Sequence, residues 1–411
     1  MRQLHGGDSG DLGANLTVLR GHNAALVLGL LRDAGEEGAS RLELAEHTGL
    51  TPQAVSKITA RLRADGLVAE AGHRPSTGGK PRTVLRLVRG ARGAVGLHLD
   101  RDRLTAVRTD LTGEPLVVRE TPLDLGAGAE AVLDTAVAEV AALLAGGVGN
   151  AGDAREAGEA GDTGGTREVR GAGGGTPGAV LGVGVAAPGP LDHVSGVLRR
   201  VTGFPGWDGY PLRDALAERL GLPVVLDKDT NAAALGLALR AADVPGAAES
   251  FAYLHLGTGL GAGLVLGGAV YRGARTDAGE FGHQVIQLDG PRCGCGNRGC
   301  IEALCLAAAA GGDTARAARL LGVGAANLVR LLDIDRVLLG GRTVLADPGP
   351  YLHGVREALH EEAARRGGAA VPVAVAGRGG RAVAEGAAQL VLAPLFARRM
   401  PAGQAGAGKT A

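Results

Sequence analysis

Apolar residues at helical spacing predict three helices in the first part of the chain. The first ends near Gly35. Its apolar face comprises Leu16, Leu19, Leu26, Leu30 and Leu31. Residues 40–48 begin with a capping box and form the second helix. Residues 51–64 form the third, because Thr is a good N-cap and Pro suits the first helical position. Its expected buried face is Val55, Ile58 and Leu62. Two helices joined by a short turn form a helix-turn-helix.

A β-hairpin wing is predicted next, because apolar residues alternate over 84–88. Residues 56–89 contain eight basic and two acidic side chains, a local charge of +6 in a chain whose formal net charge is zero. A DNA phosphate backbone requires such a field. We therefore expect a winged helix-turn-helix over residues 14–90 that binds double-stranded DNA. A solvated basic face on a protein-interaction module would carry the same charge. The expected DNA-binding residues are Thr51, Gln53, Ser56, Lys57, Arg61, Lys80 and Arg82.

The rest of the chain alternates between apolar strands and amphipathic helices, which predicts an α/β domain over residues 91–401. The expected strands are 95–99, 104–111, 180–185, 224–226, 251–256 and 337–339, and the expected helices include 129–145 and 382–398. Residues 146–178 are rich in Gly and charge and have almost nothing to bury, so we expect a disordered insertion there. Disordered tails are expected at 1–13 and 402–411.

Composition narrows the class of protein further. A length of 411 residues allows two or three domains, and only 2% of the residues are aromatic, so the core must be aliphatic. All four cysteines lie in one short segment, which is not a disulfide framework and indicates a reduced, cytoplasmic location. No run reaches the roughly 18 to 20 apolar residues of a membrane span, so we expect no membrane partner.

Three of the four cysteines and one histidine gather in a glycine-rich segment. These residues are His283, Cys293, Cys295 and Cys300. Zn²⁺ prefers four nitrogen or sulfur ligands in a tetrahedron, and the glycines let the backbone turn sharply enough to bring the sulfur atoms together. Cys305 could compete for the fourth position, but it lies in an apolar helical run and is assigned to the core. Because no ligand position would remain open, we expect the zinc to be structural.

The segment Gly-Glu-x-Gly-His at 279–283, followed by Cys-x-Cys-Gly-x2-Gly-Cys-x-Glu at 293–302, resembles the signature of the ROK family of repressors and sugar kinases. The resemblance extends from about residue 92 to residue 402. It implies a two-lobed domain with the fold that actin and the sugar kinases share. This actin-like, sugar-kinase-like fold is of the ribonuclease H-like class. Residues 14–90 in turn resemble the winged helix that is fused to the family's repressors.

The resemblance also implies an effector site for sugar hydroxyls. The matching residues are Asp229, Asn231, Glu280, His283 and Glu302. In the family's kinases the residue that matches Asp229 is the general base. Lys228 replaces a sugar-binding Asn of the family, and we expect its ammonium to favour ionised Asp229 and a phosphorylated or acidic sugar. The resemblance places Trp207 beside the sugar, although a single Trp could equally anchor a domain interface.

The chain departs from the family's kinases at the phosphate-binding hairpin. The kinases carry Asp-x-Gly-Gly-Thr, whereas residues 100–104 here are Asp-Arg-Asp-Arg-Leu. Two Arg side chains stand where glycines let the backbone approach ATP phosphates, so we expect that approach to be sterically shut. The loop 257–263 resembles the family's second phosphate motif, and the turn at 340–341 resembles its adenosine-side turn. We therefore expect no enzyme activity, with Asp229 as a relic of the general base.

The sequence thus predicts a DNA-binding transcriptional regulator, a repressor of carbohydrate genes, that forms a homodimer or homotetramer. A sugar or sugar-phosphate effector would bind its degenerate kinase-like domain. Two alternatives stay open. Asp229 and the loop 257–263 favour an active ATP-dependent sugar kinase with an accessory DNA-binding domain. Lys228 and the short segment after Glu302 favour a ligand-independent DNA-binding dimer.

Overall fold

A computed structural model of the protein describes residues 21–74, 82–145, 167–170, 178–240 and 249–396. These residues form two compact units, 21–92 together with 392–396, and 93–391. Several sequence predictions concern parts of the chain outside the described residues. They are the tails at 1–13 and 402–411, the helical positions Leu16 and Leu19, and the DNA-binding residue Lys80.

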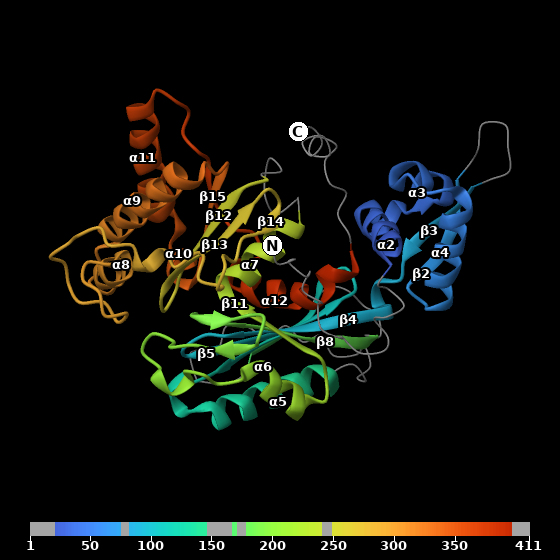
Figure 1. Ribbon diagram of the computed structural model, residues 1–411, viewed down its shortest axis with the longest axis horizontal. Coiled ribbons are helices and arrows are strands. Elements are labelled where there is room, and N and C mark those ends of the chain that lie inside the picture. The colour runs from blue at the N-terminus through green and yellow to red at the C-terminus, as the bar shows by residue number, and fades with distance from the viewer. Residues whose placement is uncertain (1–20, 75–81, 146–166, 171–177, 241–248, 397–411) are drawn as a thin grey trace, which may run out of the picture. The chain divides into compact units, whose positions relative to one another are not determined.

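The first unit has three helices and an antiparallel sheet of strand order β1-β3-β2 (Figure 1). Its elements are α2 (His22–Ala34), β1 (Ala39–Ser40), α3 (Arg41–Thr48), α4 (Pro52–Ala64), β2 (Val68–Arg74) and β3 (Arg82–Leu87). The predicted capping box is present, because Ser40 and Glu43 each accept the other's amide hydrogen through their side chains. The Thr51 hydroxyl caps α4 by accepting from the Ala54 amide. Helices α3 and α4 with the β2–β3 hairpin form a winged helix-turn-helix.

Two predicted buried faces in this unit need correction. In α4, Thr59 is buried with Val55 and Leu62, whereas Ile58 is only half-buried. Thr59 tolerates burial because its hydroxyl donates to the Ser56 carbonyl. The buried residues of α2 are Ala25, Val27, Leu28, Gly29 and Leu31. Positions 26 and 30, predicted on this face, therefore lie at its margin.

The described residues of the second unit form two large sheets and one two-stranded ribbon, and the first large sheet has the strand order β11-β8-β4-β5-β6-β7. Its strands are β4 (Arg92–Leu99), β5 (Arg103–Asp110), β6 (Pro115–Pro122), β7 (Arg167–Arg170), β8 (Ala179–Ala187) and β11 (Val224–Lys228). Helices α5 (Ala129–Ala145) and α6 (Leu212–Leu220) cover one face of this sheet, and α12 (Ala382–Leu392) lies on the other (Figure 1). A short ribbon of β9 (Leu191–Asp192) and β10 (Val197–Leu198) follows β8. We call this sheet and its helices the first lobe.

The sequence does not predict two strands of the first lobe. β6 has a half-buried pattern that gives little apolar signal. β7 lies inside the segment 146–178, so the prediction of disorder is wrong at residues 167–170. These residues pair antiparallel with β6, which offers an edge with free backbone hydrogen-bonding groups. Residues 146–166 and 171–177 lie outside the described part of the chain.

The second sheet has the strand order β14-β13-β12-β15-β16 and forms the second lobe. Its strands are β12 (Phe251–Leu256), β13 (Leu260–Leu266), β14 (Ala269–Val270), β15 (Arg336–Gly340) and β16 (Val373–Val375). Its helices are α7 (Asp229–Leu239), α8 (Ile301–Ala310), α9 (Thr314–Leu332), α10 (Arg342–Ala346) and α11 (Pro348–Arg366). The apolar core under one face is shared with α8, α9 and α11, and that under the other with α7 and α12.

Helices α7 and α12 thus lie between the sheets, and small residues let them approach. A Cβ on Gly386 would stand 2.0 Å from the Ala232 carbonyl oxygen. The last helix packs on the first lobe, because Gly96 and Gly184 lie directly against the α12 backbone. The helix ends at Leu392, before the predicted end at 398, and a short turn containing Pro394 follows it. No helix among the described residues is both long and apolar enough to cross a membrane.

Candidate metal centre and ligand cleft

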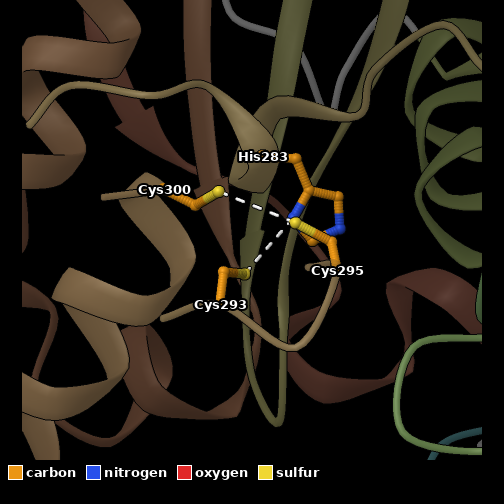
Figure 2. Close-up of side chains that lie close together, drawn as sticks. All are labelled: His283, Cys293, Cys295 and Cys300. Carbon is orange, nitrogen blue, oxygen red and sulfur yellow. Dashed lines mark hydrogen bonds between the residues drawn. The ribbon is translucent and has the colours of Figure 1, made fainter. Parts of the chain in front are cut away.

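The three cysteines and the histidine of the predicted metal site converge (Figure 2). His283 ends a short turn, Phe281–His283, and Cys300 is the N-cap of α8. The Cys293 sulfur lies 3.7 Å from His283 Nδ1, the Cys295 and Cys300 sulfurs are 3.7 Å apart, and all four donor atoms lie within 4.8 Å of one another. Tetrahedral Zn²⁺ with metal–sulfur bonds of about 2.3 Å requires donor separations of about 3.8 Å. The donor set therefore could hold such a metal.

Glycine makes this loop possible at one position in particular. Gly299 has a φ of 67°, and a Cβ there would stand 1.6 Å from the Gln287 carbonyl oxygen. Burial raises the pKa of the neighbouring Cys300 thiol to about 12. A bound cation would be needed to hold it as a thiolate at neutral pH. Cys305 is fully buried, and its sulfur contacts the Ala317 carbonyl, as expected for a core residue.

Beside the metal centre, a polar cleft runs between the two lobes. Its lining comes from the β4–β5 turn, the ends of β8 and β11, the β12–β13 loop and the metal-site segment. The residues include Asp100, Arg101, Pro188, Gly189, Lys228, Asp229, Thr230, His255, Thr258, Gly259, Glu280, His283 and Glu302. Four of the five predicted effector residues thus line one cleft, namely Asp229, Glu280, His283 and Glu302. The Glu302 carboxylate is fixed there by accepting from the Leu260 amide at 2.9 Å.

The fifth predicted effector residue, Asn231, is not in the cleft lining. It is fully buried on α7, where its amide donates to Asp227 Oδ1 at 2.9 Å. Asp227 also accepts from Arg272 Nε at 2.7 Å. Asn231 therefore stabilises the corner between β11 and α7, and a direct contact with a ligand is not available to it. Its place in the family motif gave no indication of this burial.

Lys228 also differs from its prediction. Its side chain is 3% exposed, and its ammonium donates to Glu280 Oε1 at 2.9 Å and to the Ala278 carbonyl at 2.6 Å. The expected partner, Asp229, instead accepts from the Thr230 amide at 2.6 Å. The sequence neighbours are separated because β11 ends and α7 begins between them, which directs their side chains to different partners.

Sequence reasoning missed a pair of histidines at the hairpin end of the cleft. His98 on β4 and His255 on β12 lie edge to face, with ring centroids 6.2 Å apart, and His255 Nδ1 is 3.0 Å from the Tyr253 hydroxyl. Burial lowers the pKa of His98, although Asp100 acts in the opposite direction. Burial would raise the pKa of Asp100, but His98 and the Thr258 hydroxyl, which donates to it at 2.6 Å, bring that pKa below its ordinary value. Only the alternation of β4 hinted that His98 faces away from the α5 side.

The β4–β5 turn brings one of its two arginines to the cleft. Arg101 lies in the lining with its guanidinium 5.8 Å from the Phe204 ring centroid. Arg103 lies on the exposed surface and pairs with Glu120, so its predicted place at the phosphate position is wrong. Between them, Asp102 binds Arg342 of the second lobe through two hydrogen bonds of 2.9 and 2.7 Å. Arg342 follows the turn at 340–341 directly.

Trp207 occupies neither of its two predicted places. It is 2% exposed within the first lobe, and its indole donates to the Leu125 carbonyl at 2.9 Å. It packs edge to face on Tyr210 as part of the core beneath α5 and α6. Trp207 is therefore a core residue.

The predicted DNA-binding residues that the structure describes are all exposed. They are Thr51, Gln53, Ser56, Lys57 and Arg61 on or next to α4, and Arg82 at the start of β3. Part of the basic cluster is neutralised locally, because Arg63 pairs with Glu70, and Arg86 and Arg89 both approach Glu36. Glu70 is already counted in the +6 of residues 56–89, so only Glu36 lowers this local charge further, to +5.

Comparison with known proteins agrees with this architecture. Residues 174–311 match the model of the ROK family, and residues 26–69 match a winged helix-turn-helix DNA-binding model. The chain is 32% identical to the ROK hexokinase of Thermus thermophilus over 72% of this chain and 96% of that one, with a TM-score of 0.53. The protein therefore belongs to the ROK family.

Two further relatives are a transcriptional regulator and a repressor. A ROK family transcriptional regulator, a homologue of the Escherichia coli MLC protein, shares the fold over 93% of this chain and 97% of that one, with 22% identity and a TM-score of 0.68. The xylose repressor of Caldicellulosiruptor bescii is 28% identical over 288 residues. That alignment covers 70% of this chain and 64% of the repressor, so the match spans somewhat under two thirds of the relative.

Proposed function

We propose that this protein is a DNA-binding transcriptional repressor of carbohydrate genes, controlled by a sugar that binds the cleft. The observation that carries the proposal is how the polar groups at the two ends of the cleft are bonded. Sugar-type acceptors remain at the metal end, while one ion pair, Asp102–Arg342, and one hydrogen bond, from Thr258 to Asp100, join the segments where a kinase would hold nucleotide. A winged helix-turn-helix in the same chain supplies the DNA-binding part, and relatives named as repressors support the assignment.

The hairpin end of the cleft argues against phosphoryl transfer. Asp102 and Arg342 join the β4–β5 turn to the start of α10, and Asp100 accepts from Thr258 in the β12–β13 loop. These are the three segments expected to hold ATP. Phosphoryl transfer depends on positioned phosphate-binding groups, and here such groups are bonded to one another. Asp229 lines the cleft and supports the rival reading, an active sugar kinase.

The two-lobed arrangement offers a route from ligand to DNA. A ligand that contacts both lobes binds one lobe arrangement more tightly, and it shifts the population by its differential affinity. In a homodimer or homotetramer, such a shift would change the spacing of the DNA-binding units. Zn²⁺ at His283, Cys293, Cys295 and Cys300 would have a structural part in this scheme. It would hold the turn that carries Glu280 against the start of α8, which carries Glu302.

A combined DNA-binding and turnover assay tests the proposal. Fluorescence anisotropy with DNA from the protein's own promoter region should show binding that weakens in the presence of a sugar. Replacing Lys57 and Arg82 by Ala should lower the slope of log affinity against log salt by about one unit per residue. Glu46→Ala on α3, which removes an exposed acidic group, serves as the control. Unchanged affinity and slope in the double variant would remove α4 and the wing from the DNA interface.

The same samples distinguish the alternatives. ADP production with glucose or xylose at roughly 1 to 100 per second would establish the kinase instead. DNA binding that no sugar in the panel alters would favour the ligand-independent dimer.

A further inference from the structure

The charge of the cleft carries an inference that rests on the proposed function and narrows its ligand. The lining contains two cationic side chains, Arg101 and Lys228. It contains four carboxylates, those of Asp100, Asp229, Glu280 and Glu302. With neutral imidazoles, two positive and four negative charges give the cleft a formal charge of −2. An anionic ligand would therefore need a cation that is free to receive it.

Lys228 is not such a cation. Two of its three donor positions are used by Glu280 and the Ala278 carbonyl, at 2.9 and 2.6 Å. Its aliphatic stem packs on Gly189, where an added Cβ would stand 2.8 Å from Lys228 Cδ. The side chain is 3% exposed, so moving the ammonium towards a ligand would break both bonds and leave Glu280 without its partner.

The other sources of positive potential are also offset. The N-terminus of α7 points into this region and would attract an anion, but Asp229 is the first residue of that helix and accepts from the Thr230 amide. Arg101 stands at the hairpin end against Phe204, and a Cβ on Gly259 would stand 3.4 Å from its Nη2 and 3.2 Å from Glu302 Oε2, so a carboxylate lies near the guanidinium. A carboxylate therefore lies beside each of these two positive groups, the N-terminus of α7 and the Arg101 guanidinium.

We propose that Lys228 is the internal counter-ion of Glu280, and that this pair makes the cleft select uncharged polyhydroxyl ligands over phosphorylated or acidic ones. Lys228 holds Glu280 Oε1. Glu280 Oε2, 3.9 Å from His283 Nε2, is left to accept from a ligand hydroxyl. A phosphate or carboxylate would meet carboxylates around the same position, and like charges of this kind give selectivity by repulsion. This reverses the preference for an acidic sugar that Lys228 suggests from sequence alone.

Calorimetric titration of the full-length protein tests this selectivity. The neutral ligands are D-xylose and D-glucose, and the anionic ones are glucose 6-phosphate and glucuronate. A neutral sugar should bind at least about tenfold more tightly than its anionic counterpart. Glu280→Gln keeps the side-chain shape and removes one negative charge beside Lys228, so the preference should move towards the anionic ligands by about tenfold. Glu130→Gln, which removes a carboxylate from an exposed ion pair with Arg219, should leave the ratio unchanged.

Lys228→Met gives an independent test. A lysine that binds the negative charge of a ligand and a lysine that only pairs with Glu280 predict different results for this variant. If Lys228 is the counter-ion of Glu280, Lys228→Met should also weaken the binding of neutral sugars, because Glu280 loses the partner that orients it. Selective loss of anionic binding in this variant would overturn the inference, as would tighter binding of glucose 6-phosphate than of glucose by the native protein. Both results would leave a sugar-controlled repressor intact. Failure of every ligand to bind, with DNA binding intact, would instead remove the sugar effector from the proposed function, and the inference with it.

Discussion

The two ends of the interlobe cleft use similar polar groups in opposite ways. At the metal end, Glu280 and Glu302 each have one oxygen held by the protein, by Lys228 and by the Leu260 amide. Both residues line the cleft. At the hairpin end, Asp102 has both oxygens bonded to Arg342. One end therefore retains acceptors for a ligand, and the other joins the lobes by bonds within the protein.

This difference shows how a kinase-like fold can serve as a sensor. Binding needs acceptors that are fixed but incompletely used, whereas a cleft whose charges satisfy each other has little to offer a phosphate. At the metal end, the His283–Cys300 cluster brings together two separate backbone segments, which a bound metal would join.

The largest effect should come from breaking the metal centre. Cys295→Ser should abolish metal binding and destabilise the second unit by about 4–5 kcal/mol, the scale expected for loss of a structural metal. Elemental analysis should find one zinc per chain in the native protein, and thermal unfolding gives the loss of stability. Cys305→Ser is the matched control, because its sulfur lies in the core outside the cluster. If Cys305→Ser lost the metal and Cys295→Ser kept it, the ligand set would have to include Cys305.

A second, smaller effect concerns the ligand acceptors at the metal end. Glu280→Ala should weaken neutral sugar binding by about 2–3 kcal/mol, or roughly 30- to 150-fold, because it removes a charged acceptor and leaves the Lys228 ammonium buried without its partner. Calorimetry measures the change, and circular dichroism checks the fold. Asp102→Ala, at the other end, should alter sugar affinity far less. Equal losses in the two variants would remove the distinction between the two ends.

The parts that sequence predicted best are those with local causes. The capping box at residues 40–43 and the helix Ala129–Ala145 depend on neighbouring residues, and both have their predicted positions. The convergence of His283, Cys293, Cys295 and Cys300 could be predicted because Zn²⁺ restricts the residue type and spacing of its ligands so strongly. These features require no knowledge of how distant segments meet.

The features that sequence missed depend on distant partners. Lys228 pairs with Glu280, which is 52 positions away, and its immediate neighbour Asp229 gave the wrong partner. Nothing in the sequence around Arg342 indicates its ion pair with Asp102, which depends on α10 lying opposite the β4–β5 turn. Strand β7 forms only because β6 offers an edge. Trp207 belongs to the core because the Leu125 carbonyl satisfies its indole nitrogen, which no motif indicates.

The third effect tests whether the hairpin end is held by its ion pair. Asp102 and Arg342 side chains are 52% and 44% exposed, so their coupling in a double-mutant cycle should be about 0.5–1 kcal/mol and should decrease with salt. Chemical unfolding of Asp102→Ala, Arg342→Ala and the double variant gives this value. Arg103→Ala, on the same hairpin, breaks an exposed pair with Glu120 of β6 and should show no coupling to Arg342. Appearance of ADP-forming activity in the double variant would mean that the ion pair alone separates this protein from a kinase.

The smallest effect concerns pH and His98, which lies on β4 just before the hairpin. Burial lowers the pKa of this imidazole, and His255 acts in the same direction, whereas Asp100 and Asp229 act against them. The unfolded chain, with the ordinary value of 6.5, therefore binds a proton at this position more readily than the folded protein. The contribution of neutral His98 to stability is fully present above that pH, and it is lost as the pH falls towards the folded-state pKa.

Thermal unfolding at a series of pH values from about 8 down to about 5, around the ordinary histidine pKa, measures this contribution. His98→Asn should flatten the decline in stability below about pH 6.5, because the unfolded chain then gains no proton at this position. His353→Asn, which changes an exposed histidine on α11, should leave the decline as in the native protein. Asp100 contributes in a lower range, since its pKa lies below 3.8, and it should not obscure the result. An undiminished slope in His98→Asn would place the pH dependence elsewhere, and the hairpin end would then owe its stability to its ion pairs alone.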